Sequence, residues 1–360
     1  MTDCYLVRDE HIATKAAFPV VDAHNHLWGN TSAKDIVSVM DEVGVVSYCD
    51  LTANTKVAWI DGGYQITPAN IEDFFSNFAN AYPKRFYGFT MATFACPTTQ
   101  PLFADAADFV RKTVDTLTQH VQMGARGLKL TKELGLLHRD ANDNLIHIDD
   151  PRLGDIWQTA ADLGIPVLLH QSDPAAFFQP VTPDNEHFSS LDKYPSWSFA
   201  DAKFPRKEEL LQRRDNLVRR HKRTTFILAH VANWPENLAY VSRLLDDNPN
   251  VYIDFSARID ELGRQPYTSR ELFIKYQDRI LFGTDMPISA EMYRCYFRFL
   301  ETFDEYFFTP DYDGTFGRHR WGICGIGLPN EVLAKIYHAN AMRIIPGLAE
   351  DLNELVKSGI

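Results

Sequence analysis

Residues 20–26 read VVDAHNH, a short apolar run that ends in two histidines. Consecutive apolar residues with β-branched side chains are typical of a parallel strand that is covered on both faces. Because side chains alternate along a strand, His24 and His26 are expected to share one face. An HxH pair by itself indicates a metal site no more strongly than it indicates two structural histidines, so the rest of the chain must decide.

The same pattern of an apolar run followed by a polar loop occurs eight times. The predicted strands are residues 20–26, 45–52, 85–91, 125–130, 166–170, 225–230, 251–256 and 280–285. Helical periodicity lies between and after them, at residues 35–43, 71–82, 102–122, 153–163, 207–221, 235–246, 269–277 and 331–345. Strands that alternate with helices in this way predict a parallel sheet with helices on its outer side.

Eight such units predict either a closed (β/α)₈ barrel, the TIM barrel, or a large open sheet. No GxGxxG sequence opens the first helix, which argues against a dinucleotide-binding open sheet and favours the barrel. No linker rich in proline, glycine or serine divides the chain. We therefore predict one α/β barrel domain over residues 19–360, after an N-terminal extension of residues 1–18. The stretches 171–205 and 286–328 predict insertions after strands five and eight, at the mouth where barrel active sites lie.

Composition limits the kinds of partner. Lys plus Arg is 36 and Asp plus Glu is 48, which gives a net charge of -12 and argues against nucleic acid. No apolar run approaches the ~20 residues of a membrane helix, so we expect no membrane partner. The five cysteines are scattered without CxxC spacing, which is typical of a reducing compartment. We expect a cytoplasmic protein with a small-molecule substrate, and the sequence leaves a homo-oligomer open.

Several predicted strands end in groups that bind metals or move protons. Strand one ends in His24 and His26, strand five in His170, strand six in His230 and strand eight in Asp285. The carboxyl ends of all eight strands meet at one mouth of a barrel. Burying these polar groups without partners would cost several kcal/mol, and a shared cation is the simplest way to satisfy them.

The pieces VVDAHNH, GARGLKL, IPVLLH, TFILAH, ILFGTD and NAMRII occur in this order within residues 19–347. In these pieces the chain resembles the amidohydrolase superfamily, in particular the amidohydrolase-related branch that includes decarboxylases and lactonases. The resemblance implies a distorted barrel and a divalent metal, usually zinc. It implies the ligands His24, His26, His170 and Asp285, and it implies that His230 is either a ligand of a second metal or a catalytic residue.

The chemistry of these side chains agrees with that reading. Imidazole and carboxylate groups with an open position are typical of catalytic zinc and manganese sites. Such a metal lowers the pKa of bound water from ~15.7 to about 7 and polarises a carbonyl group. Asp285 could bind the metal and also take the proton of the water. His230 could stabilise an oxyanion or act as an acid.

Three further residues are candidates for substrate binding, each with an alternative. Lys129, in the fourth strand, either bridges two metals as a carboxylated lysine or pairs with an anion, and we keep the site mononuclear. Arg258 follows the seventh strand, where it either clamps a substrate carboxylate or pairs with Asp260 or Glu261. Arg264 lies in the same segment and is a second candidate for the substrate's carboxylate.

These features predict an enzyme. The first reading is a metal-dependent hydrolase that acts on an amide, lactone or ester bond of a small carboxylated substrate. The alternative is a non-oxidative decarboxylase or hydratase that uses the same metal. A metal-binding barrel that serves only as a scaffold is a third reading, but nothing in a scaffold requires four convergent ligands.

Overall fold

The chain folds as a nearly closed barrel of eight parallel strands. The structure is a computed structural model, and it describes residues 9–60, 63–310 and 320–358. The sheet has the order β1-β2-β5-β6-β7-β8-β9-β10, with every neighbouring pair parallel. The barrel strands are β1 (Val20–Asn25), β2 (Val45–Asp50), β5 (Phe86–Thr90), β6 (Gly127–Leu130), β7 (Val167–Leu169), β8 (Phe226–Leu228), β9 (Val251–Asp254) and β10 (Ile280–Leu281). The predicted (β/α)₈ fold is confirmed.

Backbone hydrogen bonds join the first strand to the segment that follows the last. Ala23 N donates to the carbonyl of Phe282 at 3.0 Å, and Asp285 N donates to the carbonyl of His24 at 2.8 Å. The approach is close enough that a Cβ added to Gly283 would lie 2.6 Å from the His24 Cβ. The glycine of the FGTD sequence therefore allows the barrel to close next to His24.

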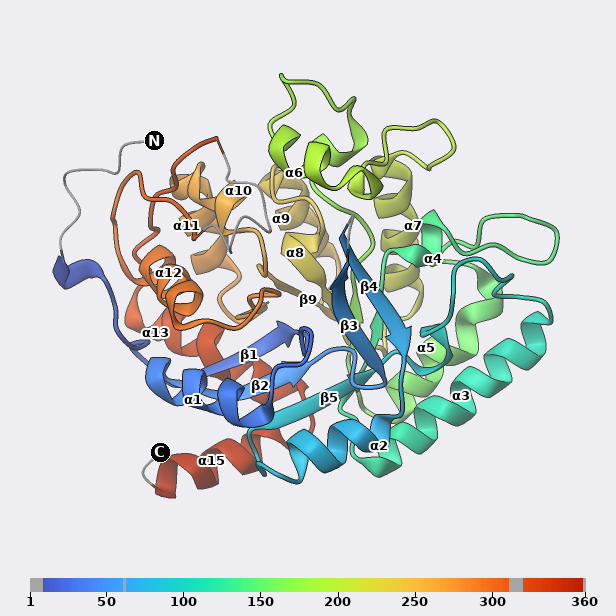
Figure 1. Cartoon of the computed structure of the whole chain (residues 1–360), viewed down its shortest axis with the longest axis horizontal. Coiled ribbons are helices and arrows are strands. Elements are labelled where there is room, and N and C mark those ends of the chain that lie inside the picture. The colour runs from blue at the N-terminus through green and yellow to red at the C-terminus, as the bar shows by residue number, and fades with distance from the viewer. Residues whose placement is uncertain (1–8, 61–62, 311–319, 359–360) are drawn as a thin grey trace.

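Helices cover the outer side of the barrel, as Figure 1 shows for α1, α2, α3 and α5. The α-helices of the described residues are α1 (Ala33–Val43), α2 (Ile71–Phe74), α3 (Ala106–Met123), α4 (Glu133–Leu136), α5 (Gly154–Asp162), α6 (Phe188–Lys193), α7 (Lys207–Arg220), α8 (Ala229–Ala232), α9 (Leu238–Asp247), α10 (Ile259–Gly263), α11 (Pro266–Lys275), α12 (Ala290–Glu301), α13 (Asn330–Ala334), α14 (Asn340–Ile344) and α15 (Leu348–Ser358). Helix α1 illustrates the local signals: the Ser32 side chain caps its first turn, and Gly44 ends it at a φ of 87°.

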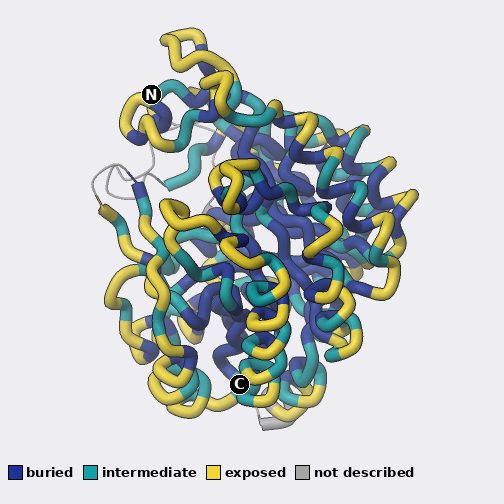
Figure 2. Tube along the Cα trace, turned by 90° about the vertical axis from the view of Figure 1, so that its right-hand side faces the viewer, coloured by how far each residue is buried: buried dark blue, intermediate teal, exposed yellow. Residues whose placement is uncertain are grey.

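Two apolar layers follow from the alternation of side chains along the strands. One layer packs between strands and helices and includes Val167, Leu169 and Phe226. The other fills the barrel interior with Leu168, Ile227 and their neighbours, and it continues into the C-terminal helices. Figure 2 shows this buried interior beneath an exposed outer surface. Lys129 lies between Leu128 and Leu130 of the outer layer, so alternation directs its side chain into the interior.

The observed strands are shorter than the predicted ones at their polar ends. Residues 170, 230 and 285 were predicted to end strands, yet β7, β8 and β10 end before them. The reason is visible at His230 and Asp285, whose φ angles of 57° and 53° are incompatible with a strand. The histidine and carboxylate side chains are presented by turns at the strand ends rather than by the strands themselves.

Several elements were not predicted, among them a hairpin and a C-terminal helix. An antiparallel hairpin of β3 (Thr55–Ile60) and β4 (Gly63–Pro68) follows the second barrel strand. Helix α15 lies at the end of the barrel opposite α6 (Figure 1) and packs Leu348 and Leu352 against the barrel interior. The predicted closing helix over residues 331–345 is divided into α13, a π-helical turn (Lys335–Ala339) and α14.

The long segments after the fifth and eighth barrel strands contain structure of their own. The first holds short 3₁₀ turns at Ala175–Phe178 and Pro195–Trp197 and helix α6. The second holds α12, and its residues 311–319 lie outside the described part of the chain. Within the described residues, no helix has the length and apolar character needed to cross a bilayer.

The buried carboxyl group of Asp50, at the end of β2, yields a prediction about pH. Burial raises its pKa from 3.8 to about 7, although hydrogen bonds from the backbone of Thr52 and Leu27 act in the opposite direction. Between pH 3.8 and about 7, the folded state therefore keeps a proton on Asp50 that the unfolded chain has already released. This contribution to stability is present at low pH and is lost as the pH rises through 7.

We expect Asp50→Asn, which is neutral at every pH, to gain stability relative to the wild type as the pH rises from 5 to 8. The change should be on the order of 1 kcal/mol or more, because one pKa unit corresponds to about 1.4 kcal/mol. Thermal unfolding of the metal-free proteins measures it, with the exposed Asp73→Asn as control. A difference in melting temperature that stays constant with pH would contradict the assignment.

Candidate functional site

A cavity of about 170 Å³ opens at the carboxyl ends of the strands. Its floor carries side chains from six of the barrel strands or the turns that follow them: His26, Lys129, His170, His230, Arg258 and Asp285. These groups come from distant parts of the sequence and meet only because the sheet is closed. The barrel thus brings together the side chains that were expected to converge.

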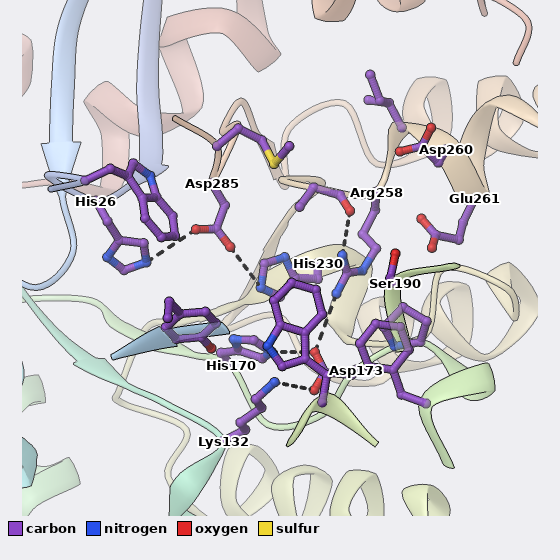
Figure 3. Close-up of a pocket in the computed structure, with 18 of the residues that line it drawn as sticks. His26, Lys132, His170, Asp173, Ser190, His230, Arg258, Asp260, Glu261 and Asp285 are labelled. Carbon is purple, nitrogen blue, oxygen red and sulfur yellow. Dashed lines mark hydrogen bonds and ion pairs between the residues drawn. The ribbon is translucent and has the colours of Figure 1, made fainter. Parts of the chain in front are cut away.

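Asp285 lies at the centre of the histidines (Figure 3). Its Oδ1 is 3.4 Å from Nε2 of His26, and its Oδ2 is 3.7 Å from Nε2 of His24 and 3.6 Å from Nε2 of His230. His24, His230 and Asp285 each offer a ligand atom within 4.8 Å of the others. The tightest group therefore contains His230, which was expected beside the ligand set rather than in it.

Partners behind the imidazole rings decide which nitrogen faces the cavity. Nδ1 of His24 lies 2.8 Å from the buried carboxylate of Asp254, and Nδ1 of His230 lies 2.8 Å from the carbonyl of Ser256. Nδ1 of His26 lies 2.9 Å from the hydroxyl of Thr52. All three rings therefore direct Nε2 towards Asp285, and His24 and His230 present it as an acceptor.

His170 is held differently from the other three histidines. Its Nε2 lies 3.3 Å from Oδ1 of Asp173, and its ring centroid is 4.4 Å from that of His230. With Nε2 directed at Asp173, Nδ1 is the nitrogen that a metal could bind. The sequence suggested the role of His170 but not the nitrogen that would perform it.

The donor set fits a divalent cation. Nε2 of His230 is buried and has no hydrogen-bond partner among the described residues. Nε2 of His24 lies 3.2 Å from Nζ of Lys129, so this nitrogen already faces a positively charged group. Nitrogen and carboxylate oxygen are the usual ligands of zinc and manganese sites with an open position.

Burial sets the protonation states at the site. Burial lowers the pKa of His24, His26 and His230 well below the usual value, and Lys129 or His170 adds to the effect. The pKa of His170 falls to about 4 for the same main reason, despite the nearby Asp173. Neutral imidazole is the form that binds metals.

Burial also shifts the pKa values of two further groups of the floor, Asp285 and Lys129. It raises the pKa of Asp285 to about 7, against the attraction of Lys129. It lowers the pKa of Lys129 to about 8, although Asp285 and Asp254 favour the charged form. A carboxyl group and an amine with such values are typical of functional sites.

The backbone at the strand ends is held in rarely populated conformations. His230, Val231, Ala232 and Asn233 all have φ between 52° and 59°, and Ala257 and Asp285 have φ of 51° and 53°. Buried polar side chains hold this left-handed turn, since Arg214 donates to the Ala232 carbonyl at 2.5 Å. Strain of this kind gathers at functional sites and persists only where surrounding contacts maintain it.

An aromatic roof, made of Trp28, Trp59, Tyr64, Phe177 and Trp197, covers the cavity. Trp59 and Tyr64 come from the β3–β4 hairpin, and Trp28 stacks on Trp59 with centroids 5.3 Å apart. The hairpin meets the segment after β7 through Tyr64 and Trp197, whose centroids are 6.4 Å apart. A cavity with charged groups below and flat rings above suits a small planar molecule.

The two arginines proposed for substrate binding lie in different surroundings. Arg258 lines the cavity, and it forms an ion pair with Asp173, with its Nη2 3.8 Å from Oδ1 of that residue. Arg264 is not among the described residues that line the cavity. It forms a two-pronged ion pair with Glu186 at 2.6 and 3.1 Å and lies over the ring of Trp321. Its charge is thus paired within the protein, away from the described lining of the cavity.

Sequence reasoning missed three charged residues of the site: Lys132, Asp173 and Asp254. Asp254 lies within the predicted strand 251–256, where a carboxylate in an apolar run is itself an unexplained polar group. Asp173 follows His170 by three residues, and Lys132 follows the fourth strand by two. Their positions near the strand ends are a signal that could have marked them as candidates, but their partners come from other strands and could not be predicted.

Comparisons with known proteins agree with this picture. The family model described as Amidohydrolase matches residues 21–347. None of the curated proteins compared with the chain matches it.

Solved structures share the fold at low sequence identity. A 2,6-dihydroxybenzoate decarboxylase from Rhizobium is 14% identical, with a TM-score of 0.54 over 93% of this chain and 99% of that one. A dihydroxybenzoic acid decarboxylase from Polaromonas sp. JS666, with bound manganese and an inhibitor, is 15% identical, with a TM-score of 0.53 over 91% and 96%. An uncharacterised TIM-barrel protein from Bordetella bronchiseptica is 18% identical, with a TM-score of 0.53 over 89% and 83%. Since the family model spans nearly the whole barrel, including every strand end that builds the site, the chain belongs to the amidohydrolase family.

Proposed function

We propose that the protein is a metal-dependent hydrolase that cleaves an amide, lactone or ester bond of a small carboxylated substrate. The observation that carries the proposal is the position of Asp285, whose carboxylate lies 3.4 to 3.7 Å from Nε2 of three histidines, His24, His26 and His230. A carboxylate held there can both bind a cation and accept a proton from a water beside it.

The proposed metal is a single divalent ion, zinc first and manganese second. His24 and His26 through Nε2, His170 through Nδ1 and Asp285 would hold it. When bound, such an ion supplies Lewis acidity and a water of lowered pKa. His230 would be a further ligand or a base, because its Nδ1 donates to the Ser256 carbonyl and leaves Nε2 as an acceptor.

The roles of the other residues follow from the hydrogen-bond donors and acceptors that they carry. Asp285 accepts the proton of the attacking water and returns it to the leaving group. Lys129 and Arg258 carry only N–H donors at the cavity and therefore suit the negative charge of a substrate or of a developing oxyanion. The earlier idea that His230 stabilises the oxyanion is less suitable, since a neutral Nε2 acceptor cannot donate to it.

A second candidate is a non-oxidative decarboxylase at the same site. The aromatic roof favours it, because flat rings suit an aromatic acid, and two of the solved structures of this fold are named as decarboxylases of such acids. In that case Lys129 and Arg258 would hold the anionic substrate, and Asp285 would supply a proton to the carbon that loses CO₂.

The metal proposal predicts the effect of removing ligands. Wild-type protein should contain near-stoichiometric zinc or manganese by elemental analysis. His24→Ala and His26→Ala should lose it, with a drop in affinity larger than the roughly 10–100-fold that loss of a partner behind a ligand causes. His138→Ala is the matched control, because His138 is buried but does not line the cavity. Wild-type metal content in both ligand variants would contradict the site.

The reaction class is tested by products formed in H₂¹⁸O from a panel of lactones, esters, amides and aromatic acids. Hydrolysis places one ¹⁸O in the acid product, whereas decarboxylation releases CO₂. Asp285→Asn should lower kcat on the active substrate by on the order of 10²–10⁴, the range for loss of a general base. Activity that survives this change nearly intact would make Asp285 a ligand only. Release of CO₂ without hydrolysis would replace the first proposal by the second.

Arg258 yields a prediction about substrate charge. We expect Arg258→Met to raise KM for a carboxylated substrate by about 10–100-fold, since charge-assisted hydrogen bonds contribute ~1.5–3 kcal/mol. The neutral amide analogue should be affected much less. Arg264→Met is the matched control, because Arg264 pairs with Glu186 outside the cavity. An equal effect on both analogues would mean that Arg258 acts only on Asp173 and the loop.

A further inference from the structure

Asp173 is a carboxylate of the cavity wall that contacts residues from three strand ends. Its Oδ2 lies 2.5 Å from Nζ of Lys132, which follows β6. Its Oδ1 lies 3.3 Å from Nε2 of His170, which follows β7, and 3.8 Å from Nη2 of Arg258, which follows β9. Figure 3 shows these partners converging on the carboxylate.

The position of Asp173 is fixed at its backbone as well as at its side chain. Lys207, a buried lysine of α7, donates to the Asp173 carbonyl and to the carbonyl of Asn233 in the strained turn after β8. The Asp173 side chain is itself buried, with 6% of it exposed. A buried carboxylate with fixed partners at both oxygens has little freedom to turn, so Oδ1 stays directed at His170.

The contact has a consequence for His170. A carboxylate accepts hydrogen bonds and cannot donate them, so His170 must carry its proton on Nε2 to make this contact. That tautomer leaves the lone pair on Nδ1. A carboxylate behind an imidazole also orients the ring and makes its other nitrogen a stronger ligand.

We propose that Asp173 is a positioning residue that holds His170 as the Nε2–H tautomer, so that His170 binds the metal through Nδ1. Lys132 acts through Asp173 by fixing the plane of its carboxylate, and it does not contact the metal. The inference rests on the proposed metal site and extends it by two residues for which the family resemblance gave no role. It also distinguishes His170 from His24, whose outer carboxylate, Asp254, contacts Nδ1 instead.

The test is the affinity of the metal-free protein for Zn²⁺ alone, measured by competition with a chelator. Asp173→Ala should weaken binding by about 10–100-fold, the usual cost of removing such a partner. Asp173→Asn should weaken it less, because the amide oxygen can still accept the His170 proton although the negative charge is gone. Lys132→Met should have a smaller effect than Asp173→Ala. Equal losses in the Asn and Ala variants would show that only the charge of Asp173 matters and would overturn the proposal.

Two controls separate this role from general stability. Asp304→Asn alters a buried carboxylate that also contacts a histidine and an arginine, His11 and Arg298, but does not line the cavity; it should leave zinc affinity unchanged. Asp254→Ala should weaken zinc binding through His24 and serves as the positive control. A loss of affinity in Asp304→Asn equal to that in Asp173→Ala would count against a specific role.

A direct measurement does not depend on any Asp173 variant folding. In zinc-loaded wild-type protein with ¹⁵N-labelled histidine, the His170 signals, assigned by comparison with His170→Asn, should show a proton on Nε2 and a metal-bound Nδ1. The opposite tautomer would overturn the inference while leaving the metal site intact. If wild-type protein binds no zinc or manganese, the metal proposal fails and this inference fails with it. If it binds zinc and Asp173→Ala binds equally tightly, only this inference fails.

Discussion

The hydrogen bond from Asp285 N to the carbonyl of His24, at 2.8 Å, is the contact on which the site depends. It joins the two ends of an eight-stranded sheet and sets the carboxylate of the last strand end against the histidines of the first. Asp22 strengthens the same seam, since its carboxylate accepts hydrogen bonds from Asn25, Thr284 and Tyr293 at 2.7 to 3.0 Å. Without this closure, His24 and Asp285 would lie at opposite edges of an open sheet.

The second constraint is burial. The three histidines of the cavity floor, the buried His24 beside them, Lys129 and Asp285 all lie in an interior that disfavours charge. The protein accommodates them by giving each ring a fixed partner, such as Asp254 behind His24 and Ser256 behind His230. It also holds the strand ends in left-handed conformations that turn these side chains inward. The result is a preorganised set of candidate ligands whose geometry costs backbone strain.

The upper half of the cavity has a different origin from the floor. The barrel strands supply the polar floor, whereas the hairpin and the segment after β7 supply the aromatic roof. The hairpin and the segment after β7 contact each other through aromatic rings. Gly63 is required at this contact because an added Cβ would lie 2.9 Å from Nε1 of Trp197. The polar groups and the aromatic groups of the cavity are therefore supplied by separate parts of the chain, as is common where loops are built on a rigid barrel.

The sequence by itself determined the barrel, the number of its strands and the residue types at their ends. This was possible because buried parallel strands leave a strong local signal, and a histidine or aspartate that ends an apolar run is unusual enough to be noticed. The sequence did not predict that the site would include Asp173 and Lys132, that Arg264 would pair with Glu186, or that a hairpin would provide the roof. Those outcomes depend on contacts between residues far apart in the chain, such as Asp173 with Arg258, and on turns whose conformation is imposed by buried partners. Local pattern fixes which groups reach the mouth of the barrel, and only tertiary packing decides which nitrogen or oxygen each one presents there.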